Sequence, residues 1–262
     1  MPNGRRPARI QSVDRAAAIL KALAGGQGRL GVSELADRLE LARPTVHGLL
    51  QTLLAQGFVE QDRVSEKYQL GAGLLQLGYS YLDVNELRSR SITYAARLAV
   101  RTNSAVRVGV RHGADAVIVH HVFRPDATLQ ILEVGAQLPL HASAVGKALL
   151  AFAPKDIVAN LLSTPLQRLT KRTATAAALR VQLEDIRMHA IATERDEAVL
   201  GESSIAAPIF DRSGIAVGAI AVVGDTERIF PRGPARGLST AVVEAARGAS
   251  RELGAVRWPF EG

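Results

Sequence analysis

The chain has 262 residues, of which 32 are Lys or Arg and 25 are Asp or Glu, and it contains no cysteine. A disulfide framework, a cysteine-ligated zinc site and a cysteine nucleophile are therefore excluded. The length predicts one large or two modest domains, and an apolar content of 47% is typical of a globular protein. No apolar stretch approaches the ~20 residues that span a bilayer, and the N-terminus lacks a signal-peptide core, so we expect a soluble, cytoplasmic protein.

The net charge of +7 is not concentrated in one part of the chain. The tail 1–9 contributes three arginines and is expected to be a disordered basic segment. Residues 10–70 carry seven basic and seven acidic side chains, which balance. Bulk charge therefore does not locate a nucleic-acid surface, and any such surface must be argued from particular side chains.

Residues 10–71 predict a helix, a short helix, a tight turn, a third helix and a hairpin. Ser12 and Ser33 are the expected N-caps of the first two helices, and Pro44 suits the first turn of the third. Strand character at 58–61 and 67–70 surrounds a polar turn. The third helix has an apolar stripe formed by Val46, Leu49, Leu50, Leu53 and Leu54. This order is typical of a winged helix-turn-helix DNA-binding domain.

The remainder of the chain alternates helices and hairpins. Residues 72–90 predict an amphipathic linker helix, and another helix follows near 91–102. Hairpins are expected over 106–123 and 204–223. Ala- and Leu-rich helices are expected over 144–153, 155–162, 177–190 and 238–253. Strands clustered with helices at the ends predict an α+β domain over 91–256.

The third helix carries the candidate DNA contacts, because the major groove of double-stranded DNA admits a helix and exposes a distinct pattern of donors and acceptors. Arg43 and Gln51 suit guanine and adenine edges, and two basic residues of the hairpin suit phosphates. The candidate residues are Arg43, Thr45, Val46, His47, Gln51, Arg63 and Lys67. An ordinary helical subdomain with a solvated polar face remains the alternative.

A second constellation occupies residues 139–147. Ser143 can cap a helix whose free N–H groups form an anion site, and Lys147 lies one turn further on. The pair Gly146-Lys147 is not a phosphate-binding Walker motif, because Ala148 stands where Ser or Thr is required. A capped helix that simply packs on a sheet remains the alternative.

No catalytic or metal-binding set emerges, and no cofactor is expected. The stretch 201–205 lacks the closing glycine of a nucleophile elbow. His120 and His121 adjoin on an expected strand, so their side chains point to opposite faces and cannot chelate one metal. Three acidic residues before the second hairpin predict a solvated loop; they are Glu194, Asp196 and Glu197.

Four ordered segments resemble the IclR-type transcriptional regulators. They are 11–20 in the first helix, 57–60 with 68–71 in the wing, 139–148, and 204–211. The resemblance implies a winged helix-turn-helix, a linker helix and a GAF/PAS-like domain with an antiparallel sheet flanked by helices, which binds a small effector. It also implies homodimers or homotetramers that are mostly repressors and sometimes activators.

The resemblance also implies a set of effector-binding residues. They are the backbone at Ala144 and Val145 beside Ser143, the acid Glu194, Ser204 where Cys is common, and Ala221 and Val223 where binders of small oxoacids carry serines. The loss of those two hydroxyls argues against a glyoxylate-like or pyruvate-like effector.

A further departure lies in the third helix. Many members of the family carry Arg where this chain has Gly48, which removes a contact and costs about 1 kcal/mol inside a helix. Close approach of the backbone to DNA is one possible reason.

Segments 81–84, 118–126 and 132–136 are similar to the branch of that family that represses glycerol operons in actinomycetes. We therefore expect a repressor of a glycerol or related carbon-source operon that binds a palindromic operator. A small anionic metabolite such as glycerol 3-phosphate is the expected effector. An activator with the same fold responding to another metabolite is the first alternative. An enzyme that uses Ser204 or His141 in the C-terminal pocket is the second.

Overall fold

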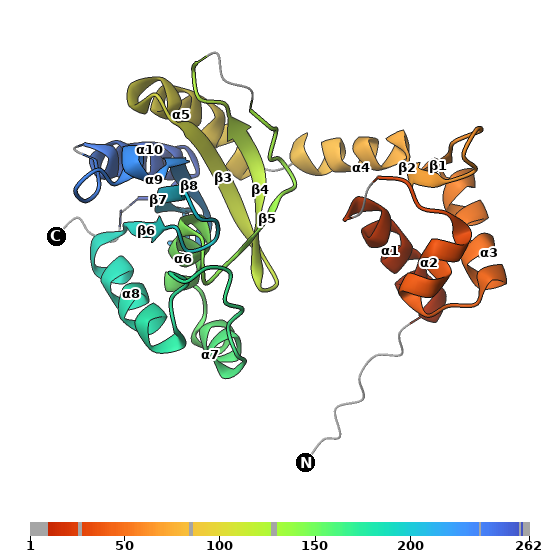
Figure 1. The fold of residues 1–262 in the computed structure, drawn as a ribbon. Coiled ribbons are helices and arrows are strands. Elements are labelled where there is room, and N and C mark those ends of the chain that lie inside the picture. Colours follow the sequence, from red (N-terminus) through yellow and green to blue (C-terminus); the bar gives the residue numbers. More distant parts are fainter. Residues whose placement is uncertain are drawn as a thin grey trace. The chain divides into compact units, whose positions relative to one another are not determined.

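The computed structural model describes residues 10–25, 28–83, 86–126, 130–235, 237–256 and 258. The basic tail expected at 1–9 lies outside these residues. The chain divides into two compact units, Met1–Val84 and Asn85–Gly262. Figure 1 shows both units with their helices and strands. No helix in the described ranges is both long and apolar enough to cross a membrane.

The first unit has the order of elements that the sequence predicts. Its strands β1 and β2 pair antiparallel, and a single bridge joins Leu30 to Tyr68. The elements are α1 (Gln11–Ala24), α2 (Val32–Leu39), α3 (Arg43–Ala55), β1 (Val59–Gln61), β2 (Tyr68–Leu70) and α4 (Ala72–Asp83). The helix-turn-helix with a hairpin wing is therefore confirmed.

The two expected serine caps are wrong. α1 begins at Gln11 behind Ile10, so Ser12 already lies inside its first turn. α2 follows Gly31, whose N–H donates to the Glu34 carboxylate at 2.6 Å. Glu34 lies at the third helical position and reaches back, as in a capping box, so the helix begins before Ser33.

The apolar sides of the first three helices meet in one core beneath the wing. On α3 the buried positions are three or four residues apart, which places them on a single side of the helix. The buried residues of this core are Ile19, Ala22, Leu23, Leu35, Ala36, Val46, Leu50, Leu53, Val59 and Tyr68. The other side of α3 is left free for polar residues.

The second unit is built on a six-stranded antiparallel sheet with the order β5-β4-β3-β8-β7-β6. Its strands are β3 (Ala105–His112), β4 (Asp115–Val122), β5 (Gln137–Pro139), β6 (Ala192–Arg195), β7 (Glu202–Phe210) and β8 (Ala216–Asp225). Its helices are α5 (Glu86–Thr102), α6 (Ala144–Ala151), α7 (Lys155–Ser163), α8 (Ala176–His189), α9 (Thr226–Ile229) and α10 (Leu238–Glu252). The expected α+β class is confirmed.

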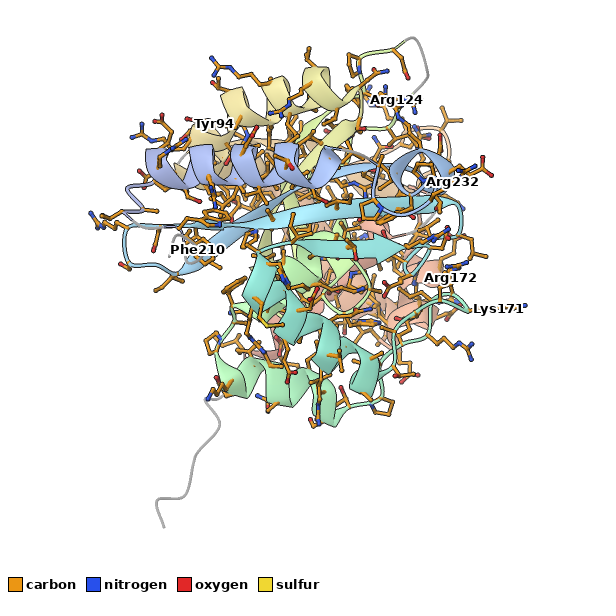
Figure 2. All side chains as sticks on the ribbon, turned by 90° about the vertical axis from the view of Figure 1, so that its left-hand side faces the viewer. Tyr94, Arg124, Lys171, Arg172, Phe210 and Arg232 are labelled. Carbon is orange, nitrogen blue, oxygen red and sulfur yellow. The ribbon has the colours of Figure 1, made fainter. Side chains whose placement is uncertain are left out.

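Helices cover both faces of this sheet (Figure 1). α5 and α10 pack together and contact β3, β7 and β8 on one face, while α6 packs on the other with α8 behind it. Gly248 of α10 lies against the ring of Tyr94 on α5, where an added Cβ would stand 2.1 Å from a ring carbon. Figure 2 shows Tyr94 beside α10 and Phe210 near the end of β7. Phe210 is packed edge-on between Phe152 and Trp258.

The linker helix expected over 72–90 corresponds to α4 and the first turn of α5, and residues 84–85 lie outside the described ranges. α4 ends at Asp83, whereas α5 runs without a break from Glu86 to Thr102. Leu87 is buried, and its side chain lies against Gly218 of the sheet. The first turn of α5 therefore belongs to the core of the second unit, which an amphipathic pattern continuous across residue 90 does not reveal.

Candidate nucleic-acid interface and ligand site

The outward side of α3 presents polar residues over its first three turns. Arg43, His47 and Gln51 are exposed, and Thr45 is half-buried. Val46 is 0% exposed and packs in the core on the same side as Leu50. A DNA contact by Val46 was expected and is wrong, because the helical period that exposes its neighbours turns Val46 inward.

The wing carries an exposed cation at its tip. Arg63 is exposed beside Val64, which is 95% exposed. The turn that holds them is organised by the Asp62 carboxylate, which accepts hydrogen bonds from the N–H groups of Val64 and Ser65. Its hydrogen bonds from Ser65, followed by the charge of Arg29, lower the pKa of Asp62. Arg63 is therefore presented on an ordered turn, as a phosphate contact requires.

Lys67 has a different environment from Arg63. Its ammonium group forms an ion pair with Glu34 of α2 at 3.0 Å. A phosphate would have to compete with this carboxylate. Lys67 thus ties the wing to α2, a role that its position in the sequence does not reveal.

Gly48 lies on the exposed side of α3, and a Cβ added there would meet no atom within 4 Å. Its φ is not in the left-handed region, since the residue is helical. Neither packing nor backbone conformation in this unit therefore requires glycine at position 48.

The residues expected to bind an effector gather on the α6 side of the sheet. Glu194 of β6 lies opposite Ser204 of β7, which lies opposite Val223 of β8. Ala221 occupies the next position on the same side and packs beneath the start of α6. All four are buried. The sequence motifs that carry them are far apart, and the fold brings them together.

The start of α6 is capped as the sequence predicts. The Gly146 N–H donates to Ser143 Oγ at 3.1 Å, and that hydroxyl donates to the Pro139 carbonyl at 2.9 Å. Ala144 and Val145 form the first turn and are buried against the sheet. Among the described residues, their N–H groups have no hydrogen-bond partner. The first turn therefore keeps two free donors.

The acidic stretch 194–197, which begins within β6, is not the solvated loop that was expected. Glu194 is 3% exposed and accepts hydrogen bonds from the Glu197 N–H at 2.7 Å and from Ser204 Oγ at 2.9 Å. Asp196 likewise accepts from Thr226 and from the Gly201 N–H. The carboxylates are buried because they satisfy the donors of the turn that links β6 to β7. Burial outweighs these hydrogen bonds and raises the pKa of Glu194 to about 7.

Lys147 does not face the free donors at the start of α6. Its ammonium donates to the Glu197 carboxylate at 2.6 Å and to the Thr193 carbonyl at 3.2 Å, and the residue is 1% exposed. Burial lowers the pKa of Lys147, although the charge of Glu197 acts in the opposite direction. Its ion pair with Glu197 fastens the acidic stretch to α6.

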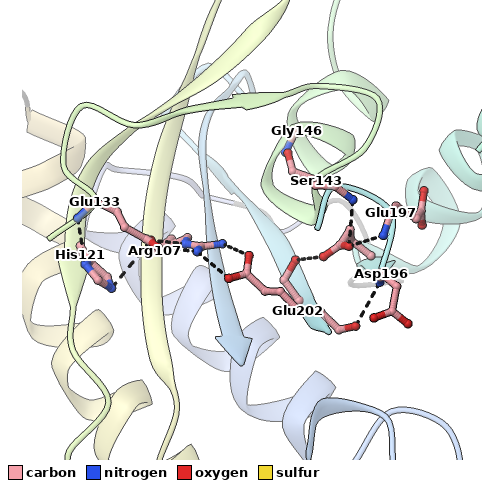
Figure 3. A network of polar contacts seen from close by, with 12 residues as sticks. Arg107, His121, Glu133, Ser143, Gly146, Asp196, Glu197 and Glu202 are labelled. Atoms are coloured by element: carbon pink, nitrogen blue, oxygen red, sulfur yellow. Dashed lines mark hydrogen bonds and ion pairs between the residues drawn. The ribbon is translucent and has the colours of Figure 1, made fainter. Parts of the chain in front are cut away.

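A second polar cluster on the same side of the sheet is absent from the sequence prediction. Arg107 of β3 donates to Glu133 and to Glu202 of β7, with one contact to each carboxylate at 2.6 Å and 2.9 Å (Figure 3). Burial alone would lower the pKa of Arg107. The hydrogen bonds and charges of Glu133 and Glu202 outweigh this effect, so the pKa of Arg107 is raised. His121 on β4 lies opposite Arg107 and accepts the Glu133 N–H.

Neither residue of the proposed enzyme alternative has the partners that a nucleophile needs. Ser204 is bonded to Glu194, and His141 is bonded to the Gln167 carbonyl at 2.9 Å. No hydrogen bond within the described ranges joins the two side chains. The described part of the chain also contains no group of three His, Asp or Glu side chains that could bind a metal ion.

Comparison with known proteins agrees with both units. The model of the IclR helix-turn-helix domain matches residues 12–63, and that of the bacterial transcriptional regulator IclR C-terminal domain matches residues 79–251. Glycerol operon regulatory proteins from Streptomyces griseus and Streptomyces coelicolor are 49% and 46% identical over 251 residues, 95% of this chain and 98% of each relative. A crystal structure of an IclR transcriptional regulator from a Silicibacter species has a TM-score of 0.81 at 26% identity, covering 96% of this chain and all of that chain. The chain belongs to the IclR family of bacterial transcriptional regulators.

Proposed function

We propose that this regulator is a cytoplasmic repressor of a glycerol or related carbon-source operon. The observation that carries the DNA-binding part is the exposed polar side of α3, where Arg43, His47 and Gln51 stand over a closed apolar core. The operon is inferred from the two Streptomyces relatives, which are named for glycerol operon regulation.

On this proposal α3 lies in the major groove of operator DNA. Arg43 and Gln51 hydrogen-bond base edges, His47 and Thr45 contact bases or the backbone, and Arg63 of the wing meets a phosphate. A homodimer or homotetramer presents two such units to a palindromic operator, with half-sites separated by whole turns of the double helix. Arg63 is the preferred wing contact, because Lys67 is already paired with Glu34.

The effector is proposed to be a small anionic metabolite such as glycerol 3-phosphate, bound where α6 begins. The free N–H groups of Ala144 and Val145, with the positive end of the helix dipole, provide donors for an anion. Ser204 and Val223 form the adjoining sheet surface. The effector acts by binding one of two arrangements of the DNA-binding units more tightly, and so shifts their populations.

A gel-shift experiment with the protein's own upstream region tests the DNA-binding proposal. At moderate salt, that region should be retained at lower protein concentration than a shuffled fragment of equal length. Absence of any sequence preference would end the proposal. A reporter fused to the same region should rise when the regulator gene is deleted, whereas a fall would identify an activator.

Ser143→Ala tests the position of the effector. The variant should weaken binding of glycerol 3-phosphate more than it weakens operator binding without effector. Thr175→Ala is the matched control, because Thr175 caps α8 through the Ala178 N–H at 3.3 Å. Equal losses in effector and operator binding by Ser143→Ala would show that the serine is only a structural cap.

A further inference from the structure

A cavity of about 340 Å³ opens beside the Arg107 cluster, at the end of the sheet where β7 begins and β8 ends. It is within the volume range of sites for small metabolites. Its principal lining residues are Arg107, His121, Glu133, Glu202, Val223 and Asp225. Val223 also belongs to the expected effector surface, so the cavity adjoins that surface.

The wall of the cavity has an excess of negative charge. Arg107 is 7% exposed and is shared by two carboxylates, both of which remain partly open to the cavity: Glu133 is 28% and Glu202 37% exposed in the side chain. Asp225 adds another carboxylate, and Arg124 forms ion pairs with Asp126 and, at 3.9 Å, with Asp225. Within the cavity lining, two guanidinium groups therefore face three carboxylates.

His121 does not compensate for this excess. Its Nδ1 accepts the Glu133 N–H at 3.2 Å, so in the neutral ring the proton lies on Nε2, 3.9 Å from a Glu133 oxygen. Burial, followed by the charge of Arg107, lowers the pKa of His121, although Glu133 acts in the opposite direction. The ring is neutral at pH 7 and offers one N–H donor to the cavity.

The charged groups of the cavity wall determine which kind of ligand can bind there. An anion would meet the carboxylates that already satisfy Arg107, whereas a hydroxyl group can donate its proton to them. A hydroxyl group can donate to a carboxylate and accept from a guanidinium at once. Adjacent hydroxyls on one small molecule match the alternating acids and bases of this wall, and Val223 and Ala105 offer an apolar surface to its carbon atoms.

We propose that this cavity binds an uncharged polyhydroxylated metabolite, a polyol or monosaccharide, at a site separate from the anion position at the start of α6. Glu133 and Glu202 accept the ligand's hydroxyl protons, while the outer N–H groups of Arg107 hold both carboxylates in place. Figure 3 shows the two neighbourhoods, with Arg107 between Glu133 and Glu202 on one side and Ser143 and Glu197 on the other.

Calorimetric titration of the full-length protein tests the site without DNA, so its failure is distinct from failure of the proposed repressor function. Glycerol, ribitol and glucose are the uncharged probes, and glycerol 3-phosphate is the anionic one. At least one uncharged probe should bind the wild type. Glu202→Gln should lower the affinity for that probe at least about tenfold, because the substitution replaces a charge-assisted hydrogen bond by a neutral one.

The controls separate the two sites. Glu184→Gln, an exposed change on α8, and Ser143→Ala should leave the affinity for the uncharged probe within about twofold, since neither residue lines the cavity. Glu202→Gln should not weaken glycerol 3-phosphate, because it removes a negative charge. Glu133→Gln provides a second cavity variant, and an unchanged unfolding midpoint identifies the variants that remain folded.

Three results would overturn the proposal. The first is that no uncharged probe binds the wild type at concentrations up to about 10 mM, roughly ten times a Kd of 1 mM. The second is a bound probe whose affinity is unchanged in both Glu202→Gln and Glu133→Gln. The third is that Ser143→Ala weakens binding of the uncharged probe as much as Glu202→Gln does, which would place the probe at the start of α6.

Discussion

The two units of this regulator place their polar groups in opposite ways. In the first unit, Arg43, His47 and Gln51 stand exposed on a helix whose other side is core. In the second, Arg107 and Lys147 are buried and held by carboxylates. Side chains that contact a large ligand such as DNA can stay exposed and need not contribute to the stability of the fold. Groups that line a site for a small molecule are buried, so their ion pairs also hold the fold together.

This difference has an energetic consequence. Exposed polar side chains contribute little to the free energy of unfolding, and most surface substitutions change it by less than about 0.5 kcal/mol. Buried charged groups have lost their hydration, so removal of one partner leaves the other without compensation. We therefore expect binding and stability to be separable in the first unit and coupled in the second.

Leu50→Ala should produce the largest effect, because it opens a cavity in the small core of the first unit. A loss of about 2–5 kcal/mol in the free energy of unfolding is expected, and operator binding should be lost with it. Trp258, the single tryptophan of the chain, packs on Phe210 in the second unit, so its fluorescence reports on that unit alone. Urea unfolding followed by circular dichroism and by this fluorescence separates the two units.

The control for this change is Leu54→Ala, on the exposed side of the same helix. It should cost well under 1 kcal/mol. If Leu50→Ala shifted the Trp258 transition as much as the helical signal, the two units would not be independent.

Glu194→Gln tests the coupling of charge and stability in the second unit. The folded protein holds the pKa of Glu194 at about 7 against an ordinary value of 4.5, so between these pH values it binds a proton that the unfolded chain has released. The free energy of unfolding of the wild type should therefore fall by about 3 kcal/mol as pH rises from 4.5 to above 7. In Glu194→Gln this part of the pH dependence of the free energy of unfolding should be absent.

Urea midpoints from Trp258 fluorescence at several pH values between 4.5 and 8 measure this difference. Glu184→Gln, with its side chain exposed on α8, provides the matched substitution and should follow the wild type. Parallel curves for the wild type and Glu194→Gln would show that the buried carboxyl titrates normally.

Arg43→Ala should separate binding from stability in the first unit. The loss of a contact to a base edge is expected to weaken operator binding by about 1–3 kcal/mol, which is roughly fivefold to 150-fold. The free energy of unfolding should change by less than about 0.5 kcal/mol, since the side chain is exposed. Arg38→Ala removes the same charge from the exposed side of α2. An equal loss of affinity in both variants would reduce the role of Arg43 to bulk charge.

Gly48→Ala should produce the smallest change in this series. Unlike Leu50→Ala, it should raise the free energy of unfolding. Nothing lies near the added Cβ, so the unfolding free energy should rise by up to about 1 kcal/mol from helix propensity alone. If the backbone at this position lies close to DNA, operator affinity should fall at the same time. A stabilised variant with unchanged affinity would show that DNA does not require the glycine.

Much of the fold was predictable because its elements carry strong local patterns. The apolar period of α3, the hairpins β3–β4 and β7–β8 and the serine cap of α6 all follow from neighbouring residues. The packing of the first turn of α5 in the core of the second unit did not follow, since the residues on both sides of position 90 are amphipathic. β5 was also missed, because three residues at a sheet edge are too few to show a period.

The charged parts of the candidate ligand site could not be predicted, because their partners lie far away in the sequence. Arg107 alternates with valines, and alternation alone gives it no partner. Its side of the sheet is covered by α6, and the guanidinium finds its carboxylates 26 and 95 residues away. Lys147 and Glu197 are likewise 50 residues apart. The signal that remains in the sequence is an arginine between two valines near the start of a strand.

The most direct measurement is a fluorescence-anisotropy titration at moderate salt that compares the protein's own upstream region with a shuffled duplex. The wild type and Arg38→Ala should prefer the upstream region by the same ratio, and Arg43→Ala should lose most of that preference while its unfolding midpoint stays unchanged. Equal affinity of the wild type for both duplexes, or an undiminished preference in Arg43→Ala, would contradict the assignment of the exposed side of α3 as the surface that reads the operator.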